Sequence, residues 1–301
     1  MPSVSVIMPC FNHARFLVDS VQGILAQTHR DLELIIIDDC SSDNSWEVMA
    51  ALAKTDARIK TIRHKRNLGA SRSRNDGMRM SVGALIGFCD ADGIWEPSKL
   101  EVQILLLDNN LNFDMTCSDA VIIDEDGQPA KRRFSEQFPP PNVAAAELFF
   151  VLVLSNFINT QTVLMRRECL ATAGYFDEKI KWVEDWWYWI NISRQHRILY
   201  CEQPLARYRV HSHSTGVTQK RGYRVNRYKV FRRILRKYDD LPIRFRAEIL
   251  YKMGVELCSL GKKRSGLRLL RNSSKLALAD ARSFGTFGRS LMRATFFRCD
   301  R

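Results

Sequence analysis

Short apolar runs alternate with helix-like patterns over the first 90 residues. The apolar runs predict strands at residues 4–8, 34–37, 59–63 and 84–89. The spacing of apolar positions predicts helices at residues 17–27, 46–53 and 71–81. The run at 34–37 is apolar throughout, as expected for a strand covered on both faces, and Pro9 is expected to end the first strand. This alternation predicts an α/β domain with a parallel sheet and crossover helices.

Two of these strands end in acidic residues. Asp38 and Asp39 follow the second strand, and Asp90 and Asp92 follow the fourth. Ligands of open parallel sheets bind at the carboxyl ends of the strands, where carboxylates are costly unless they bind something. In the D-x-D segment, alternate residues of an extended chain point the same way, so both carboxylates face one site. Their oxygen atoms suit Mg²⁺ or Mn²⁺.

The middle of the chain predicts further mixed structure. Residues 115–123 and 162–165 resemble strands, whereas D-E-D-G at 124–127 and P-P-P at 139–141 mark a turn and a loop. The most apolar segment, residues 143–154, is shorter than the roughly 20 residues that a membrane span needs. We therefore expect it to form a buried or amphipathic helix.

The net charge of +13 comes from the C-terminal part of the chain. From Thr218 onward there are 23 Lys and Arg residues against 6 Asp and Glu residues, so the preceding part is slightly acidic. Gly261 and Gly266 interrupt the apolar periodicity of this basic part, which predicts two or three short helices. We expect two domains, residues 1–217 and a basic helical extension at residues 218–301.

The cysteines and the N-terminus bear on the cellular compartment. The eight cysteines include no C-x-x-C pair and no Cys/His metal spacing, which predicts reduced, mostly buried thiols and no structural zinc. The N-terminus has no basic region followed by a long apolar stretch, so no secretion signal is expected. Together these features predict a cytoplasmic protein.

Seven segments follow one another in a characteristic order and spacing. They are VSVIMPCFN, AQTHRDLELIIIDDCSSDNS, RNLGASRSRNDG, IGFCDADGIWEPSKL, GYFDE, VEDWWYW and YRVH. The ordered set resembles family 2 glycosyltransferases of the GT-A fold over roughly the first two-thirds of the chain; the part after His213 lies outside it. The resemblance implies a nucleotide-sugar-binding domain with a central, mostly parallel sheet. It also implies transfer of a sugar in polysaccharide, lipopolysaccharide or glycolipid synthesis. UDP is the expected nucleotide, and dTDP and GDP stay open.

The resemblance implies a donor site at the strand ends. Its nucleotide-sugar-binding residues would be Pro9, Phe11, Asn12, Asp39, Arg74 and Asp90. Asp39 would accept a hydrogen bond from a base N–H and Phe11 would stack on the base, while Asp90 would contact the ribose. Arg74 would reach the diphosphate. A turn or N-cap role for Asp39, a core position for Phe11 and a surface position for Arg74 remain open.

The resemblance also implies a divalent metal and a catalytic base. Asp92 and His211 would ligate Mn²⁺ or Mg²⁺. His213 could take the place of His211 as the ligand. Alternatively, the histidine is an ordinary polar surface residue. Asp185 would take the proton from the acceptor hydroxyl in a single displacement with inversion. Its aromatic neighbours would raise its pKa by desolvation.

Two residues beside Asp185 are expected at the acceptor site. Glu184 is expected there and is also the alternative base. For Trp186, an acceptor platform and a core position are both open.

Two positions depart from the family pattern. The family often has Gly where Cys40 stands, so Cys40 indicates that the turn there need not adopt positive φ. Gly93 replaces a second acid, which leaves Asp92 as the expected metal ligand.

The basic extension allows two interpretations. Its Lys and Arg residues alternate with Phe, Leu and Tyr, which fits contact with an anionic membrane near a carbohydrate or lipid-linked acceptor. The other interpretation is a helical cap with a solvated basic face. A nucleic-acid-binding protein and a nucleotidyltransferase on a similar sheet are the competing functions. No nucleic-acid partner is expected, because no such motif is found and the acidic strand ends would have no purpose.

Overall fold

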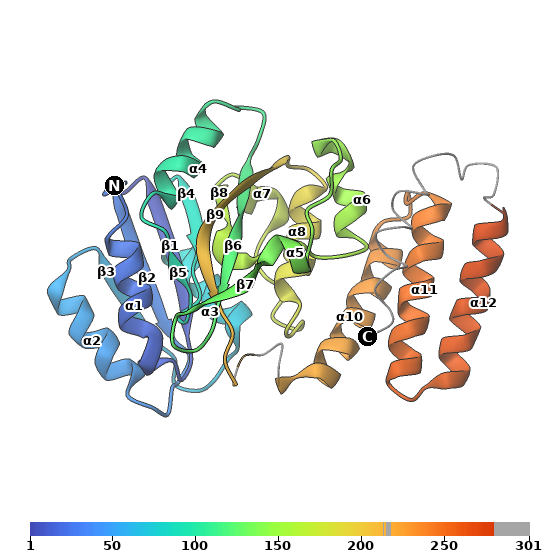
Figure 1. Cartoon of the computed structure of the whole chain (residues 1–301), viewed down its shortest axis with the longest axis horizontal. Helices are drawn as coiled ribbons and strands as arrows, with labels where there is room; N and C mark the ends of the chain where they lie inside the picture. Colours follow the sequence, from blue (N-terminus) through green and yellow to red (C-terminus); the bar gives the residue numbers. More distant parts are fainter. Residues whose placement is uncertain (213, 215–217, 280–301) are drawn as a thin grey trace. The chain divides into compact units, whose positions relative to one another are not determined.

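The computed structural model describes residues 1–212, 214 and 218–279, so His213 lies outside the described residues. The chain divides into two compact units, the first from Met1 to Lys220 and the second from Arg221 onward. The first unit is built around a mixed sheet, and the second consists of helices where it is described (Figure 1). The predicted α/β fold with a helical C-terminal extension is confirmed.

Nine strands form one sheet in the order β3-β2-β1-β4-β8-β6-β9-β5, and β7 pairs with β6. The strands are β1 (Val4–Cys10), β2 (Leu32–Asp38), β3 (Ile59–Arg63), β4 (Leu85–Phe88), β5 (Ile94–Trp95), β6 (Met115–Ile123), β7 (Pro129–Arg133), β8 (Leu164–Arg166) and β9 (Ile198–Arg209). The strands β3, β2, β1 and β4 are mutually parallel, as the alternating pattern predicted. Beyond β4 the sheet is mixed, because β8 is antiparallel to both β4 and β6 whereas β9 is parallel to β6.

Helices follow the strands of the first unit. They are α1 (Ala14–Leu25), α2 (Ser45–Thr55), α3 (Ala70–Met80), α4 (Lys99–Asp108), α5 (Phe134–Gln137), α6 (Leu148–Leu152), α7 (Cys169–Ala173) and α8 (Glu184–Ser193), with 3-10 helices η1 (Ala145–Glu147) and η2 (Thr160–Thr162). The apolar segment 143–154 therefore forms η1 and the largely buried α6. In the part of the chain that is described, no helix is long and apolar enough to cross a membrane.

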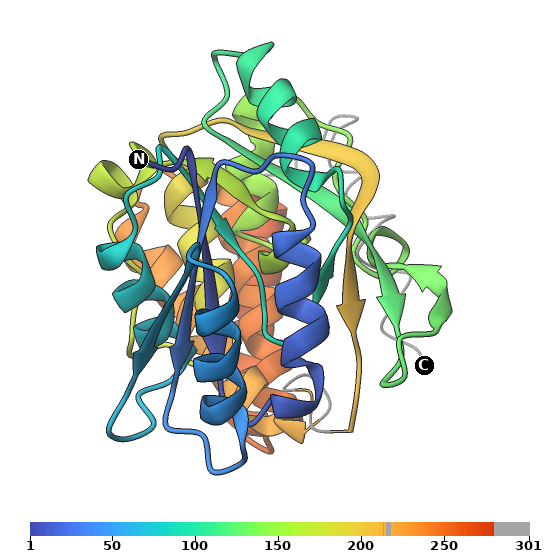
Figure 2. The same cartoon turned by 90° about the vertical axis from the view of Figure 1, so that its left-hand side faces the viewer.

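The side chains of β1 and β2 alternate between two layers of helices. Val6 belongs to the core cluster that also contains Leu17 of α1. Ile7 and Ile37 point to the other face, where an added Cβ on Gly77 of α3 would lie 2.6 and 2.9 Å from their side chains. The sheet is thus covered by α1 and α2 on one face and by α3 on the other (Figure 2). Such double coverage explains why β2 is apolar at nearly every position.

Pro9 does not end the first strand, contrary to the expectation. β1 continues to Cys10, and Pro9 pairs with Ile37 of β2. The Cys89 amide donates to the Ile7 carbonyl, so odd-numbered residues of β1 face β4. Pairing with β4 stops at Ile7. The nitrogen of Pro9 therefore faces the space beyond the end of β4. Because no strand of the described chain lies there, the lack of an N–H costs no hydrogen bond between strands.

Cys40 also differs from the expectation. Its φ is 63°, so the turn adopts the left-handed conformation that, from the sequence, it did not need to adopt. Hydrogen bonds fix the backbone on both sides of it: the Asp39 amide donates to the Cys10 carbonyl, and the Ser41 amide donates to Asp38 Oδ1. These bonds hold the turn, at a conformational cost of about 1–2 kcal/mol for a non-glycine residue.

The C-terminal helices are longer than the sequence suggested. They are α10 (Lys220–Lys237), α11 (Ile243–Ser259) and α12 (Lys263–Ala279). Gly261 breaks the chain between α11 and α12 with a φ of 81°. Gly266, however, lies buried inside α12, where an added Cβ would meet the Cys258 side chain and the Gly254 carbonyl of α11. Gly266 therefore allows the two helices to pack closely and does not interrupt them.

We expect Gly266→Ala to lower the stability of the full chain by about 1–3 kcal/mol, because the new methyl group overpacks the contact between α11 and α12. Helix propensity alone would change stability in the opposite direction, by about 1 kcal/mol. Urea unfolding measures the difference. The exposed neighbour provides the control, since Ser265→Ala should leave the midpoint unchanged or raise it. A stabilised Gly266→Ala variant would show that the contact is loose.

Candidate active site

The acidic residues of the strand ends meet at one edge of the sheet. Because β1, β2 and β4 run parallel, the loops that follow them lie at the same edge. These loops carry His13, Asp39, Asp90 and Asp92. The segment after β9 brings His211 to Asp92, which follows β4. The strand-end pattern predicted that Asp39, Asp90 and Asp92 would share this edge; His211 was expected from the resemblance.

Asp39 is held by the chain around it. It is 3% exposed, and its Oδ1 accepts hydrogen bonds from the Leu68 amide at 2.8 Å and from the His64 ring at 2.7 Å. Its Oδ2 accepts one hydrogen bond, from the Gly69 amide at 2.7 Å. The turn role that the sequence left open for Asp39 is therefore present. One oxygen still has unused acceptor capacity for a ligand.

The loop after β1 has a fixed shape. Asn12 adopts a φ of 57°, and its Oδ1 accepts from the Ser42 amide at 2.8 Å and from the Asp43 amide at 3.4 Å. Phe11 is 43% exposed, which excludes the core position that the sequence left open for it. The loop thus presents an exposed aromatic ring next to Asn12, which is bonded to the loop after β2.

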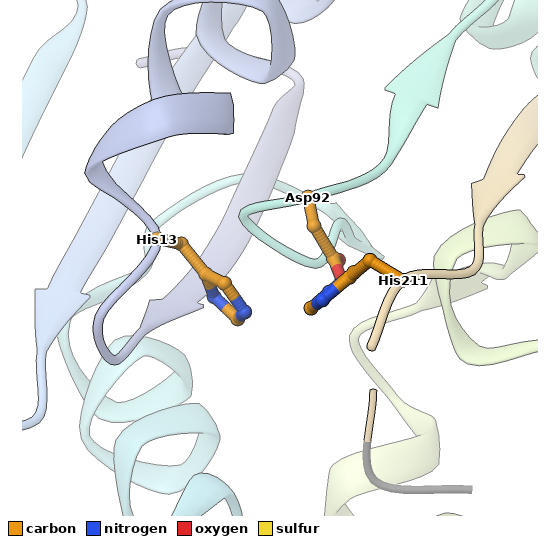
Figure 3. A group of neighbouring side chains, drawn as sticks. All are labelled: His13, Asp92 and His211. Atoms are coloured by element: carbon orange, nitrogen blue, oxygen red, sulfur yellow. The ribbon is translucent and has the colours of Figure 1, made fainter. Parts of the chain in front are cut away.

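His13, Asp92 and His211 come from three separate segments and converge (Figure 3). One ligand atom from each lies within 4.8 Å of the others. His211 Nε2 is 3.1 Å from Asp92 Oδ2, and the Arg209 side chain donates to the Asp92 carbonyl at 3.0 Å. The Nδ1 of His13 is buried and has no hydrogen-bond partner among the described residues. Such an orphaned nitrogen is costly unless it binds something.

The chemistry of this cluster fits a divalent cation. Two imidazole nitrogens and one carboxylate oxygen suit Mn²⁺ better than Mg²⁺, which prefers oxygen ligands and retained water. Asp92 and His211 were expected here, whereas His13 was missed. Its position directly after F-N, in the loop at the carboxyl end of the first strand, was the signal that could have revealed it.

The space beside Gly93 is occupied by another side chain. An added Cβ on Gly93 would overlap the Oε1 atom of Gln161. Gln161 is 1% exposed and donates from Nε2 to the Arg207 carbonyl at 3.2 Å. A side chain at position 93 would therefore require the amide of Gln161 to move.

Arg74 connects two acidic groups across the site. Its Nη2 donates to Asp90 Oδ1 at 3.0 Å and its Nη1 donates to Glu184 Oε1 at 2.9 Å. The guanidinium is largely buried. Burial raises the pKa of Asp90, and the charge of Arg74 opposes that rise. Arg74 was expected to reach a diphosphate; in this structure its guanidinium joins the donor side of the site to α8.

Asp185 has the environment of a general base. Burial, and next the charge of Glu184, raise its pKa to about 6. Thr160 Oγ1 donates to its Oδ2 at 3.1 Å, and Asn156 Nδ2 lies 3.4 Å from the same oxygen. The Trp186 amide donates to its Oδ1 at 2.6 Å. These donors hold the carboxylate in one orientation at the start of α8.

The neighbours of Asp185 are less accessible than an acceptor platform requires. Trp186 is 3% exposed, and its ring nitrogen donates to the Leu152 carbonyl at 2.6 Å. This placement favours the core position that the sequence left open. Glu184 is also buried and pairs with Arg74. Thr160 and Asn156 are site residues that the sequence reading missed, since only the folded chain brings them to Asp185.

Comparison with protein families assigns the chain to one family. A family model described as glycosyl transferase family 2 matches residues 5–171, which is more than half of the chain. The matched region contains the three loops at the carboxyl ends of β1, β2 and β4. The chain belongs to this family, as the seven segments implied.

Relatives and solved structures agree with that assignment. An uncharacterized glycosyltransferase of Rickettsia conorii is 30% identical over 207 residues, which are 69% of this chain and 33% of that protein, so the chain spans about a third of that relative. Escherichia coli WfgD, a UDP-Glc:alpha-D-GlcNAc-diphosphoundecaprenol beta-1,3-glucosyltransferase, is 39% identical over 111 residues, 36% of this chain and 43% of WfgD.

Two solved structures share the fold. Residues 1–349 of S. aureus TarS in complex with UDP-GlcNAc give a TM-score of 0.68 at 18% identity, covering 91% of this chain and 81% of that one. Mannosyltransferase PcManGT from Pyrobaculum calidifontis, in complex with GDP-Man and Mn²⁺, gives 0.60 at 16% identity, covering 97% and 79%. The chain therefore has the fold of known glycosyltransferases.

Proposed function

We propose that the chain transfers a sugar from a UDP-sugar to an acceptor hydroxyl by metal-assisted single displacement with inversion. The observation that carries this proposal is the Arg74 bridge. It joins Asp90, two residues from the cation ligand Asp92, to Glu184, the neighbour of the candidate base Asp185. Donor and base are thereby assembled in one site. The names of WfgD, which uses UDP-Glc, and of TarS in complex with UDP-GlcNAc support UDP as the nucleotide.

In this proposal Asp185 activates the acceptor. Its ionised carboxylate takes the proton of the acceptor hydroxyl while that oxygen forms a bond to the anomeric carbon. The bond between the anomeric carbon and the diphosphate oxygen breaks on the opposite side, and the nucleoside diphosphate leaves with the bonding electrons. Attack from the face opposite to the leaving group inverts the anomeric configuration. The proton ends on Asp185, held by Thr160 and Asn156.

The donor is held by the strand-end loops. Asp39 accepts a base N–H, Phe11 stacks on the base, and Asp90 contacts the ribose. His13, Asp92 and His211 would hold the divalent cation, which supplies Lewis-acid charge against the diphosphate. The Mn²⁺ in the PcManGT complex supports manganese, as does the ligand set of this cluster.

The charged surface of α12, in the second unit, bears on where the acceptor is bound. One side of α12 carries the exposed cations Arg264, Arg268, Arg271 and Lys275, which recur at helical spacing. Leu267 and Leu278 lie on the same side and are 52% and 77% exposed. We propose that this basic stripe of α12 contacts an anionic membrane at its cytoplasmic face. The lipid-diphosphate acceptor of WfgD supports a lipid-linked acceptor there.

We expect Asp185→Asn to lower turnover by about a thousandfold or more, because an amide cannot accept the hydroxyl proton. Binding of the UDP-sugar should be retained, since that contact does not need the base. Release of UDP and calorimetric titration measure the two effects. Neutralising an exposed carboxylate, as in Glu202→Gln, is the control and should change neither quantity.

The pH profile follows from the same carboxylate. Because the pKa of Asp185 is raised to about 6, the rate should fall about tenfold per pH unit below that value. The native state binds the proton more tightly than the unfolded chain, so this carboxylate favours folding at low pH and loses that contribution as pH rises through 6. Asp185→Asn should therefore stabilise the protein at pH 8 more than at pH 5. Full turnover in this variant would remove Asp185 from the mechanism.

We expect His13→Ala to weaken Mn²⁺ binding by about tenfold to a hundredfold while the fold is retained, because one of three protein ligands is lost. Titration of the protein with Mn²⁺, followed by electron paramagnetic resonance of the free ion, measures affinity without turnover. His29→Ala is the control, because His29 contacts Ser3 just before β1, whereas the cluster lies beyond the carboxyl end of that strand. Equal Mn²⁺ affinity in wild type and His13→Ala would exclude His13 as a ligand.

Replacing the four cations of the basic stripe of α12 by Gln should abolish binding to vesicles of phosphatidylglycerol and phosphatidylcholine. Each cation near an anionic surface contributes about 1 kcal/mol. Vesicle sedimentation at low and high salt measures the effect, and Leu278→Gln should weaken binding as well. Gln at four exposed cations of α10, Arg221, Lys229, Arg232 and Arg236, is the matched control with the same change in charge. Equal loss in both variants would show that net charge, and not α12, drives the contact.

A further inference from the structure

A buried histidine beside the donor site has no role in the mechanism above. His64 directly follows β3 and is 9% exposed. Its Nδ1 lies 2.7 Å from Asp39 Oδ1, and its Nε2 lies 3.2 Å from Asp76 Oδ2 of α3. An ionised carboxylate can only accept hydrogen bonds, so a ring nitrogen that bonds to either acid is the donor. His64 thus lies between two acids and makes its shorter contact with Asp39.

The second acid is itself anchored. Asp76 Oδ2 accepts from Arg72 Nε at 2.7 Å, and Asp76 Oδ1 accepts from Arg79 Nη1 at 2.9 Å. All three of these residues lie on α3. A chain of charge-assisted hydrogen bonds therefore runs from α3 through His64 to Asp39, and such bonds are stronger and more directional than neutral ones.

The two oxygens of Asp39 differ because of His64. Oδ1 accepts from both His64 and the Leu68 amide, whereas Oδ2 accepts only from the Gly69 amide. The carboxylate cannot rotate without losing three hydrogen bonds. Oδ2 is therefore left as a fixed acceptor with a free lone pair at the carboxyl end of β2.

We propose that His64 is a positioning residue that fixes Asp39 Oδ2 as an acceptor for a nucleobase ring N–H and thereby selects the base. Uracil carries such an N–H between two carbonyl groups, whereas the equivalent nitrogen of cytosine is an acceptor that a carboxylate repels. His64 acts through Asp39 and does not itself contact the donor. This inference rests on the proposed use of a UDP-sugar.

Two substitutions distinguish the contributions of the two ring nitrogens of His64. Asn places an N–H near the position of Nδ1 and keeps the bond to Asp39, whereas Gln places one near Nε2 and keeps the bond to Asp76. We expect His64→Asn to bind UDP within about threefold of wild type, and His64→Gln to bind it about tenfold more weakly, the usual effect of losing a hydrogen bond to a charged group. Affinity for CDP should be low and equal in all three proteins.

Calorimetric titration of the full chain with UDP and with CDP, in the presence of Mn²⁺, tests the inference. Thermal unfolding identifies any variant that fails to fold, and the ratio of UDP to CDP affinity is read only from folded proteins. Equal UDP affinity in the Asn and Gln variants, whether retained or lost in both, would overturn the positioning role. If wild type binds neither nucleotide, the proposed function fails and the role of His64 fails with it.

Discussion

The site depends on the buried, positively charged guanidinium of Arg74. Asp90, Glu184 and Asp185 would repel one another at low solvent exposure, and unpaired buried carboxylates would take up protons. Arg74 lies between Asp90 and Glu184 and offsets their charge. Its charge also limits the rise in the pKa of Asp185 that burial and Glu184 produce. The pKa of Asp185 is therefore raised only to about 6, so its carboxylate is ionised at neutral pH and, in the proposed enzyme, is still basic enough to take a proton.

The parallel half of the sheet was predictable because its signal is local. Each of β1, β2 and β3 is a short, mostly apolar run followed by a helix, and β4 is the apolar run after the third helix, so periodicity alone located all four. β9 was missed because it contains Pro204 and alternates irregularly between buried and exposed positions. It is stabilised by pairing with β6, about 80 residues earlier in the chain, and its register shifts at Asp119. No local pattern encodes such a pairing.

In the candidate site, too, some features could be predicted from local sequence whereas others depend on the folded chain. Asp92 and His211 were expected together from their motifs, and the structure brings them to 3.1 Å. The contacts that decide individual roles depend on the folded chain: Gln161 fills the space beside Gly93, and hydrogen bonds on both sides force Cys40 into positive φ. Residue type at one position cannot reveal what another segment places against it.

The loop after β1 would connect the two ends of the proposed donor site. Phe11, Asn12 and His13 are consecutive, yet the first is an exposed ring and the last belongs to the cluster with Asp92 and His211. The left-handed conformation of Asn12 turns the chain between them, and its side-chain oxygen accepts from the loop after β2. An L-residue keeps that conformation only when its contacts offset the conformational free energy that it costs. In the proposed enzyme, base recognition and cation binding are therefore positioned by one clamped residue, so a shift at either end is transmitted to the other.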